Sequence, residues 1–485
     1  MRFRADRSLR VLSSRDDLVP VLGGSPLRLW RLTPAGGALI ARLAAGADVA
    51  VGDGSPTGAL VDRLLDVGAL HPEPSSLPTR FGPRDVTVVI PVRDRAAALA
   101  RLLGSLASFR DAGAGVVVVD DGSADGPAHR GVAEEHGAGH LRRDRPGGPA
   151  AARDAGIAVV TTPIVAVIDS DCEVPDGAGR WWEAPLRLLS DERTAAVAPR
   201  VRTPAGPRLL QRYEALRSPL DLGSEPARVS PGTRVSYVPA AALLLRTDAY
   251  RAVGGFDRDL HVGEDVDLVW RLAAAGHRVR YEPSVVVEHP ARPGVLGWLR
   301  QRFVYGTSAA PLEARHPGQV APARCSPWSA AGWSIAVLGP RRVGPLVGMG
   351  VLASSAAILP RRLEGVPALD AWRLAVHGHL GAGRQLARAV LRTWWPVGLV
   401  AAVPGSPLRR PARRALAIVA AVAVCDAAIE ARRSGSNAGA AMVATIAALA
   451  VADDMAYGAG VWWGCLGSRS LRSLLPRFER SAHRL

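Results

Sequence analysis

The sequence predicts an α/β fold in which helices flank a mostly parallel β-sheet. Three short runs rich in β-branched residues, Val86–Ile90, Val116–Val119 and Ile164–Ile168, alternate with the helix-like segments Ala96–Leu106 and Gly148–Val160. Strands that are joined by helical crossovers run parallel in one sheet. Because ligands of such sheets bind beyond the carboxyl ends of the strands, we expect a binding site at that edge.

A small mixed block over residues 1–78 precedes this region. Pro20–Pro26 is predicted to form a strand and a turn, and Thr33 is predicted to cap a helix with Pro34 at its first position. A second helix is expected over Leu60–Val67. The segment Pro72–Pro78 predicts a linker, so the block forms a small winged-helix-like domain of its own.

The rest of the chain divides into an α/β domain over residues 84–310 and an Ala-rich helical region over residues 330–485. Three apolar stretches of the helical region, Val343–Leu359, Ala415–Ile429 and Ala438–Ala452, are about 15 to 17 residues long, whereas a membrane span needs roughly 20. Asp426 lies inside the second stretch, and Asp453 follows the third. Spanning, interfacial and buried helices therefore all stay open, and we favour association with a membrane.

The charge of the chain agrees with a membrane surface as a partner. There are 60 basic residues, all of them Arg, against 44 acidic residues, which gives a net charge of +16. Pairs of arginines punctuate the apolar stretches of the last third, and such pairs are attracted to anionic lipid. No nucleic-acid-binding module is recognisable, so we expect no nucleic-acid partner. The pairs are Arg341-Arg342, Arg361-Arg362, Arg409-Arg410, Arg413-Arg414 and Arg432-Arg433.

The amino terminus and the cysteines bear on the cellular location. The first residues have no apolar core of signal-peptide length, so we expect the α/β domain at the cytoplasmic face of the cell membrane. The four cysteines have no CxxC spacing, so they predict neither a zinc site nor a disulfide framework.

Carboxylates gather where the predicted strands end. Asp169 and Asp171 follow one strand, and Asp120 and Asp121 end the strand before it. Paired carboxylates suit a hard divalent cation, Mn or Mg, that keeps open positions for phosphate oxygens. An Asp-x-Asp tripeptide also occurs as a simple turn after a strand. Together with a further acidic site, this pattern favours a metal-dependent glycosyltransferase with a nucleotide-sugar donor.

The further acidic site is Gly263–Asp267, which opens a predicted helix. Acidic residues in a first helical turn are stabilised by the helix dipole, which is one explanation for Glu264 and Asp265. Inverting sugar transfer also needs a base that takes the proton of the acceptor hydroxyl. We predict Asp265 as this base, with Glu264 orienting it or the acceptor.

Two further residues are candidates for the site. His289 follows the predicted strand Val285–Glu288 and is either a metal ligand beside the carboxylates or an ordinary packed residue. Arg153 lies one turn inside a helix that follows the glycine-rich segment Pro146–Gly148. This segment either meets phosphate or is a plain junction between loop and helix.

Several motifs resemble, in order and spacing, those of glycosyltransferase family 2. The resemblance implies a GT-A fold, Pro91, Arg93 and Asp121 by the nucleotide, Arg153 near the phosphates, Asp169 on ribose and metal, Asp171 on metal, and Asp265 as the base. The usual Asn after Arg153 is Asp154 in this chain. The motifs are Val89–Asp94, Asp120–Ser123, Ala152–Gly156, Asp169–Asp171, Gly254–Asp257 and Gly263–Asp267.

The chain as a whole is similar to the glycosyltransferases of mycofactocin systems in actinobacteria. Leu22–Pro26, Leu32–Gly36 and Trp298–Ser308 carry this resemblance, together with the Ala-rich tail. It implies transfer of glucose from UDP-glucose to a small peptide-derived redox cofactor. The first 78 residues resemble peptide-binding domains of peptide-modification systems, which implies docking of partner proteins; a purely structural appendage is the alternative.

Other functions remain as alternatives. A cell-wall or lipid-linked glycosyltransferase would share the same catalytic domain, and a non-catalytic scaffold would be expected to have lost one of the acidic sites. A dehydrogenase is disfavoured because no G-x-G-x-x-G follows Ile90 and Pro91 occupies that turn. The Q-x-x-R-W pattern of processive synthases is absent, so the number of sugars added stays open.

Overall fold

The computed structural model of the protein describes residues 1–485 except 14–16, 50–53, 364, 434–438 and 480–485. The chain forms two units, which are described separately below. The first comprises residues 1–11 and 21–291, and the second comprises residues 12–20 and 292–485.

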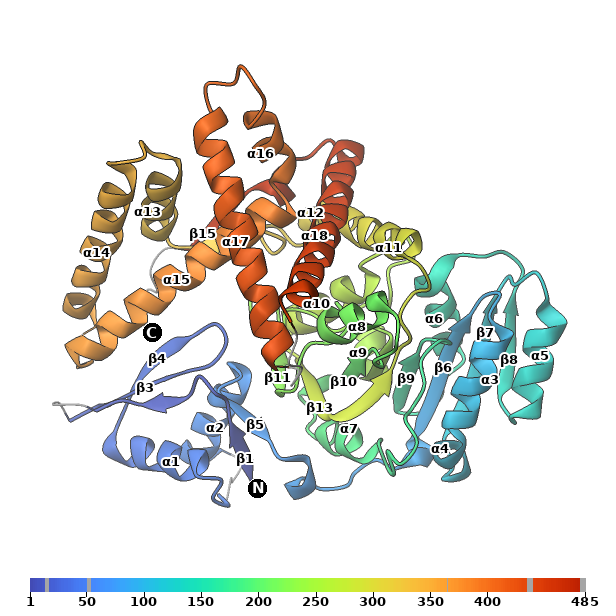
Figure 1. The fold of residues 1–485 in the computed structure, drawn as a ribbon. Helices are drawn as coiled ribbons and strands as arrows, with labels where there is room; N and C mark the ends of the chain where they lie inside the picture. Colours follow the sequence, from blue (N-terminus) through green and yellow to red (C-terminus); the bar gives the residue numbers. More distant parts are fainter. Residues whose placement is uncertain (14–16, 50–53, 364, 434–438, 480–485) are drawn as a thin grey trace. The chain divides into compact units, whose positions relative to one another are not determined.

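An eight-stranded sheet organises the first unit, in the order β11-β13-β10-β12-β9-β6-β7-β8 (Figure 1). Strands β6, β7, β8 and β9 run parallel, as do β10 and β13, whereas β12 is antiparallel to both of its neighbours and β11 is antiparallel to β13. The predicted mostly parallel sheet is therefore confirmed. The strands are β6 Val86–Val92, β7 Gly115–Asp121, β8 Gly139–Arg143, β9 Ile164–Ile168, β10 Thr194–Arg202, β11 Ala227–Val229, β12 Ala242–Arg246 and β13 Arg278–Glu288.

Helices cover both faces of this sheet, and successive side chains of each strand point to the two faces in turn. Val88 and Ile90 of β6 share a core with Leu99 of α3, whereas Val89 faces α6 on the other side. A Cβ on Gly156 of α6 would lie only 2.4 Å from Val89 Cγ1, so glycine permits this close approach. The helices are α3 Ala96–Ser105, α4 Ala107–Asp111, α5 Gly126–Glu135, α6 Gly148–Ala158, α7 Glu183–Leu188, α8 Leu209–Arg217, α9 Thr247–Ala252 and α10 Glu264–Ala274.

The first 72 residues form two small sheets and two helices. Strands β2, β3 and β4 make one sheet, and β1 pairs antiparallel with β5. Thr33 accepts a hydrogen bond from the Gly36 N–H at 3.3 Å, so the predicted cap is confirmed. The elements are β1 Phe3–Ala5, β2 Arg10–Val11, β3 Val19–Gly23, β4 Arg28–Leu32, α1 Pro34–Ala44, α2 Pro56–Asp66 and β5 Leu70–Pro72, followed by the 3-10 turns Pro74–Ser76 and Pro83–Asp85.

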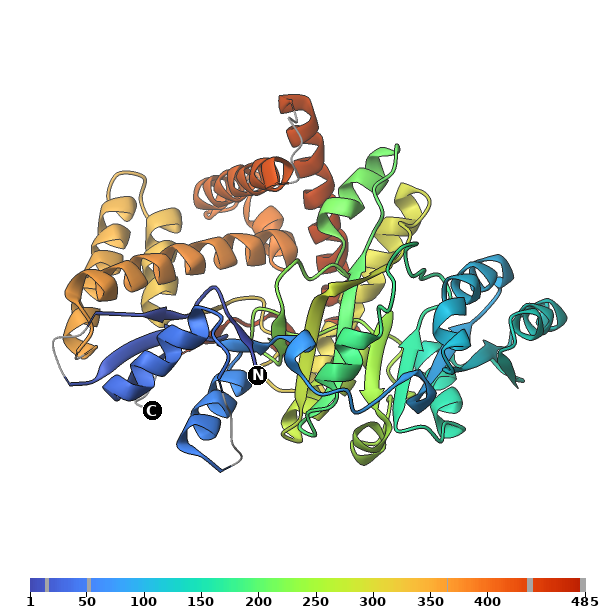
Figure 2. The ribbon, with the colours of Figure 1, turned by 90° about the horizontal axis from the view of Figure 1, so that it is seen from below.

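The second unit is helical over most of its length. Helices α13, α14 and α15 pack together, as both ribbon views show (Figures 1 and 2). A short parallel pair of strands, β14 and β15, joins distant parts of this unit. The elements are α11 Val295–Thr307, α12 Ala309–Arg315, β14 Arg324–Cys325, α13 Pro327–Leu338, α14 Gly344–Arg362, α15 Ala368–Arg392, α16 Trp395–Ala401, α17 Arg409–Arg433, α18 Ala440–Ser468, a 3-10 turn Arg472–Leu474 and β15 Arg477–Phe478.

Backbone-to-backbone contact joins α11 and α18. A Cβ on Gly306 would lie 2.0 Å from the Tyr457 carbonyl oxygen, and one on Gly460 would lie 1.9 Å from the Phe303 carbonyl oxygen. Glycines at both positions therefore allow the two helices to touch along their length.

The aspartates of this unit are paired with arginines of neighbouring helices. Asp453 lies 3.0 Å from Arg302, and Asp454 accepts a hydrogen bond from Arg392 at 2.7 Å. Asp426 accepts hydrogen bonds from both Arg384 and Arg388. These pairs explain how α17 and α18 extend to 25 and 29 residues, well beyond their apolar stretches. Helix α18 continues through Asp453 and Asp454, the two residues that follow the third apolar stretch of the sequence.

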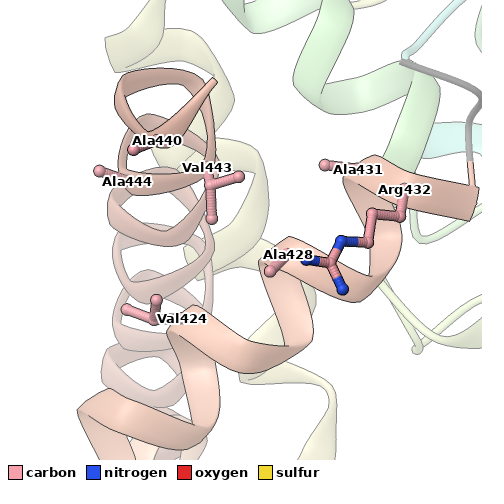
Figure 3. A pocket seen from close by; sticks show the side chains of 7 residues that line it. All are labelled: Val424, Ala428, Ala431, Arg432, Ala440, Val443 and Ala444. Atoms are coloured by element: carbon pink, nitrogen blue, oxygen red, sulfur yellow. The ribbon is translucent and has the colours of Figure 1, made fainter. Parts of the chain in front are cut away.

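Helix α18 is long and apolar enough to cross a membrane by length and composition. A cavity of about 380 Å³ lies between α17 and α18 (Figure 3). Arg432 is the charged member of its seven lining residues; the others are Val and Ala side chains of the two helices.

Candidate active site

Two loops at the carboxyl edge of the sheet hold each other in place. Asp94, which follows β6, accepts a hydrogen bond from the Ala124 N–H at 2.8 Å, and its own N–H donates to Ser123 Oγ at 3.0 Å. Asp120 is fully buried and accepts from the Ser123 N–H at 2.8 Å and from Arg142. Burial alone would raise the pKa of Asp120, but these hydrogen bonds outweigh it and lower the pKa.

Asp121 fixes the glycine-rich loop that precedes α6. Its carboxylate accepts hydrogen bonds from the N–H groups of Gly147 at 3.0 Å and Gly148 at 2.8 Å, and it pairs with Arg143. The loop therefore has a defined path at the start of α6. The structure places Asp121 beside this loop, with its oxygens engaged by the backbone.

Arg153 joins the first carboxylate of the Asp-x-Asp motif to the acidic helix. This side chain is 3% exposed, and it donates to Asp169 Oδ1 at 2.5 Å and to Glu264 Oε1 at 2.8 Å. Its guanidinium also lies 5.5 Å from the centre of the Phe256 ring. Burial opposes the charged form, but the two carboxylates outweigh burial and raise the pKa of Arg153. Three side chains from different elements thus form one ionic chain around a buried guanidinium.

The predicted base lies at the start of α10. Asp265 accepts hydrogen bonds from the N–H groups of Val266 at 2.8 Å and Ala240 at 3.3 Å. Burial raises the pKa of Asp265 above its ordinary value, although Arg153 opposes this. Burial and the neighbouring charge of Asp265 raise the pKa of Glu264 to about 7. Both carboxylates are thereby shifted toward the range in which proton transfer is efficient near neutral pH.

Asp171, the second carboxylate of the Asp-x-Asp motif after β9, lies beside His289, which follows β13. Asp171 Oδ1 lies 3.4 Å from His289 Nε2, and its second oxygen pairs with Arg95. Hard divalent cations such as Mg are held by one or two carboxylates together with substrate phosphates, so these residues fit part of a cation site. Among the described residues, no group of three or more His, Cys, Asp or Glu side chains could hold a metal unaided. Donor oxygens would have to complete the coordination.

The remaining predicted residues lie around this edge. Pro91 is buried in β6 and pairs with Val119 of β7. Arg93 follows β6, is 57% exposed and lies 3.5 Å from Asp94. The structure therefore brings together Arg153, Asp169, Glu264 and Asp265 in one group and Asp171 with His289 in another, with Arg93 pointing into solvent.

Asp154, at the position where the motif usually has Asn, anchors the turn before α10. It accepts from the Tyr250 hydroxyl at 2.9 Å and from Arg258 Nε at 2.8 Å. The same hydroxyl accepts from the Phe256 N–H at 2.9 Å. Arg271 donates to the Gly255 carbonyl oxygen at 2.6 Å. The turn that leads into the predicted base is therefore held by side chains from two directions.

Sequence reasoning missed Arg95 and Arg258. Arg95 is the cation that pairs with Asp171, and the prediction of Arg93 by the nucleotide is a separate one. A signal was present in the sequence, because Arg95 directly precedes the predicted helix Ala96–Leu106. Arg258 could have been noticed as the cation that follows Gly254–Asp257, since the exchange of Asn for Asp154 adds a negative charge that needs a partner.

The chain is similar in sequence to several known glycosyltransferases. Residues 87–252 match the model of the family described as glycosyl transferase family 2. A pre-mycofactocin glycosyltransferase of Mycobacterium tuberculosis is 40% identical over 490 residues, which covers 98% of this chain and 97% of that protein. The glycosyltransferase AglE of Haloferax volcanii is 28% identical over 231 residues, which is 46% of this chain and 71% of that protein.

A search of solved structures found a mannosyltransferase of Pyrobaculum calidifontis in complex with GDP-Man and Mn2+. It has 21% sequence identity and a TM-score of 0.39, and the match covers 72% of this chain and 88% of that chain.

The predicted GT-A class is confirmed by the family match together with the mostly parallel sheet and its flanking helices. The prediction that the protein is a glycosyltransferase is confirmed as well. This chain is a glycosyltransferase that belongs to family 2 and, within it, to the family of the pre-mycofactocin glycosyltransferases.

Proposed function

We propose that the protein transfers glucose from UDP-glucose to a peptide-derived redox cofactor precursor, with inversion at the anomeric carbon. The observation that carries this proposal is the ionic chain Asp169–Arg153–Glu264, which ties the donor motif to the helix that holds Asp265. The name of the Mycobacterium tuberculosis relative supports pre-mycofactocin as the acceptor, because the likeness extends over almost the whole chain.

The chemistry follows from the position of Asp265. The acceptor hydroxyl oxygen forms a bond to the anomeric carbon while the bond from that carbon to the diphosphate breaks, and the bonding electrons leave with UDP. The hydroxyl proton passes to the Asp265 carboxylate. Glu264 stays beside it and, held by Arg153, keeps the helix start in place.

Asp169, Asp171 and His289 would hold a divalent cation, Mn or Mg, with phosphate oxygens of the donor. Such a cation neutralises the charge that develops on the leaving diphosphate. Arg153 has a buried Nε–H without an acceptor among the described residues, which supports a place for it near the phosphates. Pro91, Arg93 and Asp121 would border the nucleotide, with Asp121 acting through the loop that it holds.

We further propose three functional parts: a docking domain over residues 1–78 for partner proteins of the modification system, the catalytic domain over 84–310 and a membrane-binding region over 330–485. Exposed apolar side chains support the last part, since Leu346 is 75% and Val400 is 71% exposed. Arg341 and Arg342 lie between α13 and α14, where they can meet anionic lipid at the cytoplasmic face. An interfacial position fits better than a span, because Asp453 and Asp454 lie inside α18.

Calorimetric titration with UDP, UDP-glucose, GDP-mannose and dTDP-sugars, with and without Mn, tests the donor. Metal-dependent binding of the UDP compounds alone supports the proposal, and binding of GDP-mannose alone refutes the donor class. Asp265→Asn should abolish transfer while it spares donor binding. Asp171→Ala should weaken metal-dependent donor binding. Near-normal turnover of Asp265→Asn would show that another group is the base.

Vesicle flotation tests the membrane proposal. The protein should float with vesicles that contain anionic lipid and less with neutral vesicles. Leu346→Glu in α14 should reduce flotation several-fold, whereas Leu209→Glu, at a position that is 44% exposed in the first unit, should not. Equal flotation of both variants would argue against α14 as the contact.

A further inference from the structure

Three arginines share one face of the outer strands of the sheet, at the edge opposite the active site. Arg278 and Arg280 lie at the start of β13, and Arg228 of β11 is the direct partner of Arg280 in the antiparallel register. Arg278 and Arg280 are each 3% exposed. Since residues two apart on a strand face the same way, the three cations are neighbours. Like charges in direct cross-strand pairs are destabilising unless an anion lies between them.

The nearby carboxylates are committed to Arg278. Its guanidinium donates to Asp62 and Asp66 of α2, both at 2.7 Å, and to Asp191 at 3.1 Å. Arg193 shares two of these acids, donating to Asp66 at 2.8 Å and lying 3.7 Å from Asp62. These three carboxylates therefore already serve two cations.

Arg280 and Arg228 lack such partners. Over the described part of the chain, the buried Nε and Nη2 of Arg280 and the Nε of Arg228 have no hydrogen-bond acceptor. Burial and the charge of Arg278 lower the pKa of Arg280 to about 10, which leaves it charged at neutral pH. A buried guanidinium with two free donor atoms is costly unless a ligand supplies the acceptors.

Asp6, which follows β1 in the two-stranded sheet of β1 and β5, is already engaged by other groups. His71 of β5 is 4% exposed and its pKa is lowered, by burial and by the charge of Arg280. The carboxylate of Asp6 is engaged by the His71 ring at 3.3 Å and by the Ser8 N–H at 2.9 Å, and it lies 3.9 Å from Arg234. Among the described residues, the cations Arg193, Arg228, Arg278 and Arg280 therefore outnumber the acids Asp62, Asp66 and Asp191, which leaves an excess of positive charge.

We propose that Arg228 and Arg280 form a binding site for a ligand carboxylate, at the junction of the N-terminal block and the catalytic sheet. A guanidinium matches a carboxylate through two parallel N–H donors, and one negative charge balances the excess. Arg228 is partly exposed, so the proposed site borders solvent on its side. The carboxylate comes either from a small free acid or from the terminus of a peptide. The site is independent of the proposed nucleotide-sugar chemistry.

The test compares the thermal unfolding of the full chain in different anions at constant ionic strength and pH 7.5. Sodium chloride, acetate and phosphate are used, together with an N-acetylated tripeptide and its C-terminal amide. Ligands that bind only the folded state raise Tm, so acetate or the free tripeptide should raise Tm by about 2 °C over chloride. The amide should give no rise. A response to the tripeptide but not to acetate assigns the carboxylate to a peptide, and the reverse assigns it to a small acid.

Variants decide whether the response belongs to this cluster. Arg280→Met and the more exposed Arg228→Gln should each lose the carboxylate response, whereas Arg180→Met, at a surface arginine paired with Glu183, should keep it. If Arg280→Met does not fold, Arg228→Gln alone decides. Equal Tm in all anions, a response to phosphate alone, or an unchanged response in Arg228→Gln would overturn the proposal.

Discussion

Arg153 and Glu264 form a buried ion pair, with 2.8 Å between guanidinium and carboxylate, that connects α6 to the first turn of α10. The same guanidinium holds Asp169 at 2.5 Å. The residue after β9 and the helix that carries Asp265 are thus fixed relative to one another. Any displacement of one carboxylate is transmitted to the other through a single side chain.

Arg153→Lys should lower kcat/KM by about 100-fold, because one ammonium group cannot span both carboxylates and a shift of 1 Å in a site has an effect of this size. It should also lower the free energy of unfolding by about 3 kcal/mol, since a carboxylate is left buried without its partner. Transferase kinetics and urea unfolding measure the two effects. Arg101→Lys is the control, because Arg101 forms an exposed pair with Glu173 that contributes little. Equal behaviour of the two variants would contradict the bridging role.

The raised pKa of Glu264, about 7 in place of 4.5, predicts a pH dependence of stability. Between these two values the folded protein binds more protons than the unfolded chain, so the free energy of unfolding falls as pH rises through this window. The effect is on the order of 2 kcal/mol. Urea unfolding should show that the free energy of unfolding falls more between pH 5 and pH 8 for the wild-type protein than for Glu264→Gln. Parallel losses in both proteins would rule out Glu264 as the source.

The same substitution should change the pH profile of catalysis. Burial and the charge of Asp265 raise the pKa of Glu264 to about 7, so an inflection near that pH in the acidic limb of the kcat/KM profile should be lost in Glu264→Gln. An acidic limb that stays in place would mean that another group titrates there.

Gly156→Ala should destabilise the first unit by about 2 kcal/mol, because the new Cβ would lie 2.4 Å from Val89 Cγ1 and 2.7 Å from Val119 Cγ2. Gly131→Ala is the matched control in α5, where a Cβ meets nothing within 4 Å. It should stabilise by up to about 1 kcal/mol through the higher helix propensity of Ala. Chemical denaturation of both variants measures the difference. A neutral Gly156→Ala would mean that α6 moves away from the sheet without cost.

Asp154→Asn should raise the KM for the acceptor several-fold while the donor Kd stays unchanged. The substitution removes the charge that holds Arg258, so the turn that carries Phe256 loses one of its two anchors. The free energy of unfolding should change by less than about 1 kcal/mol, because Arg258 is 67% exposed. Steady-state kinetics with each substrate varied in turn checks this. A change confined to donor binding would show that Asp154 acts on the donor and not on the acceptor.

The sequence predicts well those strands whose two faces are both apolar. Val86–Ile90 and Ile164–Ile168 are predicted as strands because their residues are apolar, apart from Thr87. Both strands are observed, with every position of the two segments buried. The first half of β13 was not predicted, and only Val285–Glu288 was expected as a strand. Arg278, Arg280 and Glu282 interrupt the apolar pattern, although the fold buries all three.

The acidic site residues could be placed by their positions after strands and at a helix start, whereas their partners could not. The contact of Arg95 with Asp171 depends on the direction in which the chain turns after β6, where Asp94 takes the left-handed conformation with a φ of 55°. The pairing of Asp453 with Arg302 is set by packing between distant helices, so it is invisible to local periodicity.

The glycine contact between α11 and α18 has a consequence for the order in which the chain acquires its structure. Domains of large proteins fold in sequence as the ribosome releases them. All strands of the catalytic sheet precede residue 289, so that sheet can be complete early in synthesis. Gly306 cannot meet its partner until Gly460 has been synthesised, and until then α11 exposes an uncovered backbone groove. Over this interval the nascent chain is most dependent on chaperones or lipid, and premature termination would release a finished sheet with an unpaired helix attached.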